Sequence, residues 1–98
     1  MPTSILQRIR AAIFNGDYDL TQPAVEEMAE DGLTLIDVEH AVLNGGITKT
    51  ETDDERGTRF TIRGWSADAH VEVGVVGRFT EVGIYLIITA YQVTRSEE

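Results

Sequence analysis

The sequence contains no cysteine, which excludes disulfide bonds and thiolate-ligated metal sites. It also has no apolar run close to the roughly 20 residues that a membrane-spanning helix needs, so we expect no membrane partner. Near the N-terminus, Gln7, Arg8 and Arg10 interrupt the apolar pattern, and the segment is too polar for a secretory signal. We therefore expect a cytoplasmic protein.

Basic residues are scarce, since the 98 residues include 8 Lys and Arg against 17 Asp and Glu, for a formal net charge of −9. Residues 15–44 hold eight acids and no base. A surface this acidic repels polyphosphate at long range, so nucleic acid is a disfavoured ligand. A basic protein partner fits the charge better, although solvation alone also accounts for surface acids.

The first half of the chain has the apolar periodicity of helices. Thr3 or Ser4 can cap a first helix that ends at Asn15-Gly16, and residues 17–20 form a connector. Thr21 is a suitable N-cap for a second helix with Pro23 in its first turn. Thr34 and Asp37 approximate a capping box for a third helix, which Asn44-Gly45-Gly46 ends.

Each predicted helix has an apolar side that should face a core. In the first helix this side comprises Ile5, Leu6, Ile9, Ala12 and Ile13. In the second it comprises Ala24, Val25, Met28 and Ala29. In the third it comprises Leu35, Ile36, Val38, Ala41, Val42 and Leu43.

From Ile47 the apolar period changes to two, which is typical of strands. We expect strands over Ile47–Thr52, Thr58–Trp65, Ala69–Phe79 and Ile84–Val93, the last being the most central because it is apolar on both faces. Short connections favour an antiparallel meander. The sequence therefore predicts a single α+β domain over residues 1–98, with two to three N-terminal helices packed on one face of a roughly four-stranded antiparallel meander sheet.

The second predicted helix carries a ridge of four carboxylates opposite its apolar side: Glu26, Glu27, Glu30 and Asp31. Such a ridge could bind a divalent cation, dock a basic partner, or simply be solvated. No calcium-loop pattern is present, so we predict no metal site and no cofactor. We take the ridge as the candidate partner-binding surface.

The predicted sheet offers a second candidate site, because arginine and aromatic side chains alternate along its strands. One face would present Arg59 or Arg63 together with Trp65, His70, Glu72, Tyr85 and Tyr91. His70 and Glu72 have a spacing that suits acid–base chemistry, but any alternating strand offers such pairs. Cross-strand pairs that only stabilise the sheet are the simpler interpretation. His40 is interpreted as a boundary residue of the third helix.

Several short patterns recur along the chain in the order of a known family. They are Gly-Asp-Tyr-Asp-Leu-Thr at 16–21, Ala-x-x-x-Met-x-x-x-Gly-Leu at 24–33, Asp-Val-Glu-x-Ala-Val at 37–42, Gly-x-Arg-Phe-x-Ile-x-Gly at 57–64 and Ile-x-Thr-Ala-Tyr at 87–91. Over residues 5–93 the chain resembles the domain-of-unknown-function 4258 family. The resemblance implies a small α+β domain related to the RelE/MqsR-like ribonuclease toxins, with a suspected toxin–antitoxin role.

The resemblance also implies a helical motif that reads approximately Thr-x-His-Ala-x-x-Arg-Met-x-x-Arg-Gly-Ile. A histidine and two arginines on one helix side would suit a phosphodiester substrate. The matching positions here are Pro23, Glu27 and Asp31, so the proton-transfer group is lost and both basic positions are reversed in charge. An activity on that ridge should therefore be absent from this chain.

We therefore predict a non-catalytic domain that acts through protein–protein contact, with a basic protein or a second copy of the chain as its partner. The alternative is a RelE/MqsR-like ribonuclease toxin-type domain whose catalytic residues lie on the sheet. For that alternative the candidate catalytic residues are Arg63, His70 and Tyr91.

Overall fold

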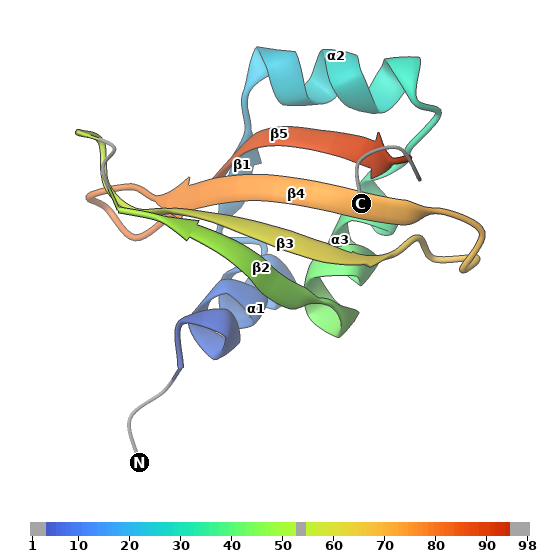
Figure 1. Ribbon diagram of the computed structural model, residues 1–98. Helices are drawn as coiled ribbons and strands as arrows, with labels where there is room; N and C mark the ends of the chain where they lie inside the picture. The colour runs from blue at the N-terminus through green and yellow to red at the C-terminus, as the bar shows by residue number, and fades with distance from the viewer. Residues whose placement is uncertain (1–3, 53–54, 95–98) are drawn as a thin grey trace.

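The computed structural model describes residues 4–52 and 55–94 (Figure 1). Three helices and five strands form an α+β fold in the following order: α1 (Ile5–Asn15), β1 (Tyr18–Leu20), α2 (Gln22–Glu30), α3 (Leu35–Asn44), β2 (Gly46–Glu51), β3 (Arg59–Trp65), β4 (Glu72–Phe79) and β5 (Tyr85–Val93). The mixed helix-and-strand class and the succession of helices before the meander agree with the sequence prediction.

The helices begin where the sequence placed their caps. The Ser4 hydroxyl accepts a hydrogen bond from the backbone N–H of Gln7 and the Gln7 side chain accepts one from Ser4, a complete capping box for α1. Thr21 caps α2, and Thr34 with Asp37 forms a second capping box for α3. Thr3, the other candidate cap for α1, lies outside the described residues.

The sheet has five strands in the order β1-β5-β4-β3-β2. Strands β2 to β5 form the predicted antiparallel meander, whereas β1 pairs with β5 in parallel, with Tyr18 opposite Tyr85. The prediction of four antiparallel strands with a connector at residues 17–20 was therefore wrong. A three-residue strand has almost no periodicity of its own, and β1 exists because β5 offers it a free edge.

Strand β4, not the C-terminal strand β5, is the central one. Strand β4 also begins at Glu72, three residues later than predicted, because Ala69 adopts a left-handed backbone with φ of 62°. A non-glycine residue in that region ends an extended segment, and residues 66–71 form a loop instead.

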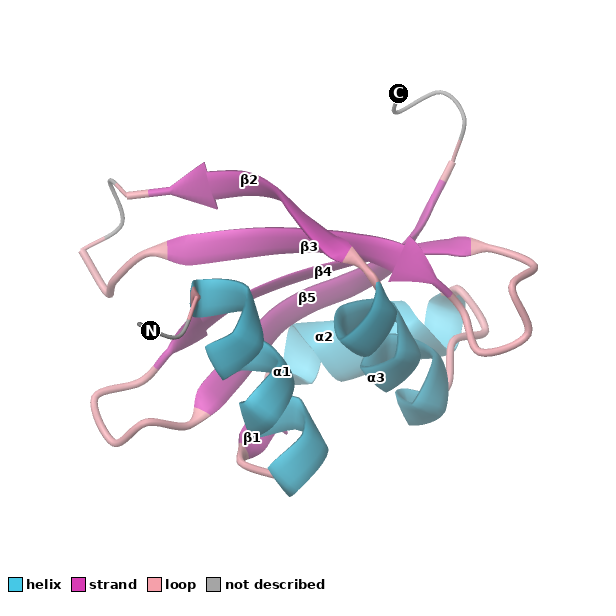
Figure 2. Cartoon of the chain, turned by 90° about the horizontal axis from the view of Figure 1, so that it is seen from below, coloured by secondary structure: helices cyan, strands magenta, loops and turns pink. Residues whose placement is uncertain are grey.

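Two of the three described helices, α1 and α3, lie on one face of the sheet, within the predicted range of two to three. Helix α3 packs on β3 and β4, and α1 packs mainly on α3. Helix α2 instead runs alongside β5, apart from α1 and α3 (Figures 1 and 2). We call the side of the sheet opposite α1 and α3 the open face.

The buried core lies between the sheet and the helices, and the fully buried side chains include Ile9, Val38, Ile62, Val75 and Ile87. Four residues predicted to face the core are exposed instead: Val25, Ala29, Leu35 and Ile36. They lie on helix sides that no other element covers, so the periodicity overestimated the width of the buried stripe.

Helix α3 approaches β3 closely because two glycines leave room for it. A Cβ atom placed on Gly64 would lie 2.2 Å from the carbonyl oxygen of Ala41. One on Gly45 would lie 2.3 Å from the carbonyl oxygen of Arg63. This contact also brings His40 of α3 to the end of β3, where its Nδ1 lies 2.8 Å from the Trp65 carbonyl oxygen. His40 is half-buried there, as expected of a boundary residue.

Candidate functional site

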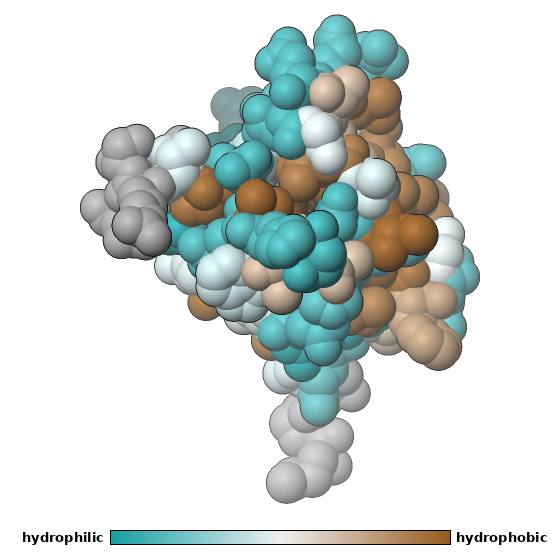
Figure 3. Space-filling view, turned by 90° about the vertical axis from the view of Figure 1, so that its right-hand side faces the viewer, coloured by the Kyte–Doolittle hydropathy of each residue, from teal (hydrophilic) through white to brown (hydrophobic). Residues whose placement is uncertain are grey.

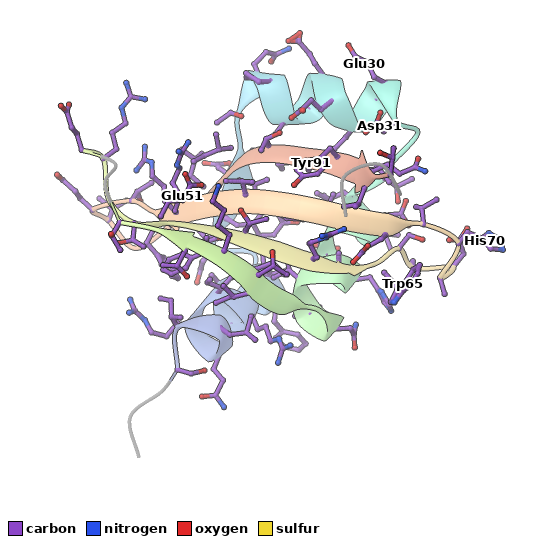
Figure 4. The ribbon with its side chains drawn as sticks, in the orientation of Figure 1. Glu30, Asp31, Glu51, Trp65, His70 and Tyr91 are labelled. Carbon is purple, nitrogen blue, oxygen red and sulfur yellow. The ribbon has the colours of Figure 1, made fainter. Side chains whose placement is uncertain are left out.

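The four carboxylates of the α2 ridge do not form one free surface. Glu27 is half-buried and accepts a hydrogen bond from the Thr89 hydroxyl of β5. The Oδ2 atom of Asp31 accepts the backbone N–H of Gln92 at 2.8 Å. Glu26 and Glu30 are exposed on the outer side of α2, where Figure 4 labels Glu30. Two carboxylates of the predicted binding surface therefore also attach α2 to β5.

These contacts protect an edge of the sheet. Strand β1 pairs with β5 only at residues 85–87. Beyond residue 87, α2 lies alongside β5 and covers its edge. The Thr21 hydroxyl donates to the carbonyl oxygen of Ile88 at one end of α2, and Asp31 accepts from Gln92 at the other. An edge strand with unpaired backbone groups can template aggregation, so α2 shields this one.

A β-bulge in β5 decides which aromatic residues reach the open face. Val76 pairs with Thr89 and Gly77 pairs with Ile87, so Ile88 is the extra residue. Tyr85 and Tyr91 are six residues apart and would share a face of a regular strand. The bulge places Tyr85 in the core with no exposed surface. The prediction that Tyr85 joins the outer set was therefore wrong.

Tyr91 remains on the open face and lies across β4, as Figure 4 shows. A Cβ atom on Gly74 would come within 2.5 Å of the Tyr91 ring, so the missing side chain makes room for it. Arg63 occupies the next register position on β3, opposite Gly74. Arg63 and Tyr91 line one cavity of about 460 Å³ together with Thr48, Lys49, Glu51, Thr61, Val76 and Val93.

The arginines of this cavity region are paired with carboxylates across neighbouring strands. Arg63 Nη2 lies 3.1 Å from Glu72 Oε1, and Arg59 Nη2 lies 3.2 Å from Glu51 Oε2. Such pairs stabilise a sheet and also neutralise the cations that a phosphate would need. The Nε atom of Arg63 is buried without a hydrogen-bond partner within the part of the chain that the structure describes.

His70 is not on a strand face beside Glu72, as the alternation had suggested. It lies in the loop between β3 and β4, where its Nδ1 is 3.1 Å from Asp68 Oδ2. Because a carboxylate accepts, Nδ1 is the donor in this bond, and Nε2 is left for other partners. His70 still lines a second cavity of about 520 Å³ with Trp65, Val71, Glu72, Gln92, Val93 and Thr94.

The loop that carries His70 is fixed by its own hydrogen bonds. The buried Ser66 hydroxyl donates to Asp68 Oδ1 at 2.7 Å, and the backbone N–H of His70 donates to the same oxygen at 3.1 Å. The Ser66 hydrogen bond is the largest of the effects that lower the pKa of Asp68, followed by the backbone N–H of His70. Asp68 is a site residue that the sequence analysis missed, although Ser-x-Asp-x-His is a spacing that favours such turns.

The sheet thus brings together two of the three candidate catalytic residues, and the third lies in the loop at one end of the sheet. Arg63 and Tyr91 share one cavity, His70 lines the other, and both cavities include Val93. The Arg63–Glu72 pair spans the two cavities, since Arg63 lines one and Glu72 the other. Figure 4 shows Trp65 and His70 at one end of the sheet and Tyr91 nearer its middle.

A further polar pair lies on the opposite side, between β1 and α3. The Tyr18 hydroxyl donates to Glu39 Oε2 at 2.6 Å. Burial and the neighbouring carboxylate raise the pKa of Tyr18 to about 12, so the phenol stays protonated and remains a donor at neutral pH. The Glu39 carboxylate thus receives a hydrogen bond from an uncharged donor.

Two further findings concern ligands and membranes. Across residues 4–52 and 55–94, no group of three or more acidic or histidine side chains is arranged to hold a metal ion. No helix within the same ranges is both long enough and apolar enough to cross a membrane.

A family model matches residues 20–92, described as a domain of unknown function, DUF4258. The chain belongs to the DUF4258 family. The match begins at Leu20, so it includes α2, α3 and strands β2 to β5, and α1 precedes it. The comparisons with curated proteins and with solved structures gave no match. Membership of DUF4258 carries no assigned activity, and the function has to be argued from the geometry.

Proposed function

We propose that this DUF4258 protein is a non-catalytic domain that binds a basic protein partner through the outer side of α2. Glu26 and Glu30 are one turn apart on this side, and both are exposed. Neither has a basic neighbour in sequence, since residues 15–44 contain none. Unopposed carboxylates on a fixed helix attract cationic partners and increase the rate of association.

The observation that carries this proposal is that a large apolar side chain is exposed beside these carboxylates. Val25 adjoins Glu26 on α2 and keeps 47% of its surface exposed. In Figure 3, hydrophilic side chains cover the top of α2 and hydrophobic ones gather below it. Exposed apolar groups rimmed by charge are typical of protein interfaces.

The experiment that tests this proposal compares two variants with the same change in net charge. Glu26→Lys/Glu30→Lys alters the proposed surface, whereas Glu55→Lys/Glu81→Lys alters two exposed acids far from α2 in sequence. We expect affinity purification at low salt to recover a basic protein with the native chain and the Glu55/Glu81 variant only. Recovery of the same partner by all three proteins, or by none, contradicts the proposal.

A second candidate function is the ribonuclease toxin-type activity on the open face. The observation that favours it is the Asp68-oriented imidazole of His70, which lines a cavity that shares Val93 with the cavity of Arg63 and Tyr91. Asp68 fixes which ring nitrogen carries the proton, as in acid–base catalysis. The Glu72 carboxylate on Arg63 and the net charge of −9 weigh against it, because both oppose binding of a polyanion.

The two candidates are separated by an RNA cleavage assay with the purified chain. The proposed non-catalytic role predicts no cleavage and no growth defect on expression. Cleavage that is lost in both His70→Ala and Arg63→Ala, with folding retained by circular dichroism, would instead establish the ribonuclease activity.

A further inference from the structure

The two edges of the sheet differ in whether another element covers them. On one side, β1 and then α2 cover β5, and Asp31 accepts the Gln92 N–H at 2.8 Å. On the other side, β2 pairs only with β3, and no described strand lies beyond it. Figure 2 shows β2 as the outermost strand with no helix beyond its outer edge. The outer backbone groups of β2 are therefore available to another strand.

The side chains of this edge are arranged so that the strand complements itself. Lys49 and Glu51 are two residues apart and both line the open-face cavity, so they project from the same face. Lys49 is exposed and forms no ion pair within the described part of the chain. Glu51 is held by Arg59, with 3.2 Å between Nη2 and Oε2.

We propose that β2 pairs in antiparallel fashion with β2 of a second copy, about a two-fold axis through Thr50. In this register Thr50 faces Thr50, and Lys49 of each protomer faces Glu51 of its partner. Directly opposed side chains in an antiparallel pair lie on the same face, so both Lys–Glu contacts form on the open face. The interface is isologous, as a two-fold axis requires.

The position of the bulge in β2 fits this register. The register shift lies between Ile47 and Lys49, and the three residues from Lys49 to Glu51 follow it in an uninterrupted register. The proposed ladder uses that regular part and leaves Thr48 at its margin. Such a short ladder predicts a weak dimer that forms at high protein concentration and does not extend further.

The charge distribution also favours this edge for contact between two copies. Residues 46–65 contain four acids and four bases, whereas residues 15–44 contain eight acids and no base. Two chains of net charge −9 repel each other over most orientations. Pairing through β2 brings together a neutral segment and keeps the two α2 helices at opposite ends of the joint sheet. The proposal uses a different surface from α2 and stands whether or not a basic partner exists.

The first experiment reverses each charge and measures the dissociation constant by sedimentation equilibrium. Lys49→Glu places like charges opposite each other, and so does Glu51→Lys. We expect each variant to dimerise about tenfold more weakly than the native chain. An equimolar mixture of the two variants restores both opposite-charge contacts, and we expect it to form a heterodimer with native-like affinity.

A second experiment keeps the charges and uses the absence of cysteine from the sequence. Thr50→Cys would place two thiols opposite each other across the axis, at a separation that a disulfide can span. We expect mild oxidation to cross-link Thr50→Cys much faster than Val82→Cys, which is 84% exposed in the turn after β4. Circular dichroism of every variant checks that the fold is retained.

Three results overturn the proposal. One is a native chain that stays monomeric at millimolar concentration. Another is a dimer whose dissociation constant is unchanged in both folded charge-reversal variants, because the contact would then lie elsewhere. The third is equal cross-linking of Thr50→Cys and Val82→Cys. Weaker dimers in the single variants with recovery in the mixture, or selective cross-linking at Thr50, support it.

Discussion

At the scale of single residues, the fold depends on a few critical positions, and at the first of them the absence of a side chain is what matters. Gly64 allows α3 to pack directly against β3, with Ala41 as its neighbour. This approach places His40 within hydrogen-bond distance of the Trp65 carbonyl oxygen at the end of β3. A side chain at position 64 has no space to enter, because its neighbours are backbone atoms that cannot rotate away.

We predict that Gly64→Ala destabilises the protein by about 3 kcal/mol, at the upper end of the usual cost of overpacking. Its Cβ would meet the Ala41 carbonyl oxygen at 2.2 Å, so α3 must shift. Gly46→Ala is the control, since a Cβ there meets no atom within 4 Å. Urea unfolding measures both, and equal stabilities of the two variants would contradict the close packing.

Asp37 is the second critical residue, because it joins two parts of the fold. Its Oδ2 accepts the Thr34 N–H at 2.9 Å, and its Oδ1 accepts the Ala67 N–H of the loop after β3 at 3.1 Å. The backbone hydrogen bond from Thr34 is the main cause of the lowered pKa of Asp37, with a further contribution from Ala67. Asp37 therefore favours the folded state while it is ionised.

We predict that Asp37→Asn costs about 1 kcal/mol of stability at neutral pH, the usual net value of a lost hydrogen bond. A lowered folded-state pKa gives stability that is fully present above the ordinary value of 3.8 and lost as the pH falls through the folded value. The difference between native chain and variant should therefore shrink below pH 3.8. Thermal unfolding across pH measures it, with the exposed Asp19→Asn as control. A difference that grows in acid would refute this role.

At the scale of elements, α2 covers the free part of β5 and contributes only two residues to the core. These are Ala24 and Met28, the buried residues of the helix. Its attachment relies on polar contacts at both ends, from Thr21 to Ile88 and from Asp31 to Gln92. A helix held in this way should detach from the sheet when those contacts are removed, while the rest of the fold persists.

We predict that Glu27→Ala/Asp31→Ala increases amide hydrogen exchange at Gln92, because the N–H loses its acceptor. The expected loss of global stability is about 1 kcal/mol for each hydrogen bond. Glu26→Ala/Glu30→Ala removes the same number of carboxylates from the outer side of α2 and should leave exchange at Gln92 unchanged. Equal exchange in both variants would show that α2 is not held by these contacts.

At the scale of the whole molecule, charge is distributed unevenly between the helical half and the sheet. Residues 15–44 provide acids only among their charged side chains, while two arginines of the sheet are paired with acids across strands, in Arg59–Glu51 and Arg63–Glu72. The helical half therefore repels itself, and the sheet does not. Because of this asymmetry, the two proposed contacts have different partners. The acidic α2 would bind a cationic protein, and the neutral segment around β2 would bind a second copy.

We predict that added salt raises the melting temperature of the native chain, because screening weakens the self-repulsion of the acidic segment. Glu26→Lys/Glu30→Lys should show a smaller rise, since it removes part of that repulsion. Differential scanning calorimetry in sodium chloride measures both. A melting temperature that falls with salt in the native chain would mean that attractive ion pairs dominate instead.

The sequence by itself determined the features that depend on near neighbours. Helix starts follow from Ser4, Thr21 and Thr34, because an N-cap acts over three residues. The four long strands follow from the alternation of apolar and polar residues. The DUF4258 patterns lie along these helices and strands. The acidic character of α2 is likewise a property of composition.

Only the tertiary structure decided the features that depend on distant parts of the chain. Because of the bulge at Ile88, Tyr85 lies in the core and Tyr91 lies on the open face. Counting alternate residues along a regular strand would have placed both on the same face. Strand β1 and the carboxylates of Glu27 and Asp31 obtain their roles from β5, more than sixty residues away. A β-bulge changes the local backbone conformation at little cost in free energy, so the sequence around it has no distinctive periodicity. The same holds for a short strand that adds to a sheet edge. Both are stabilised by contacts that exist only after folding.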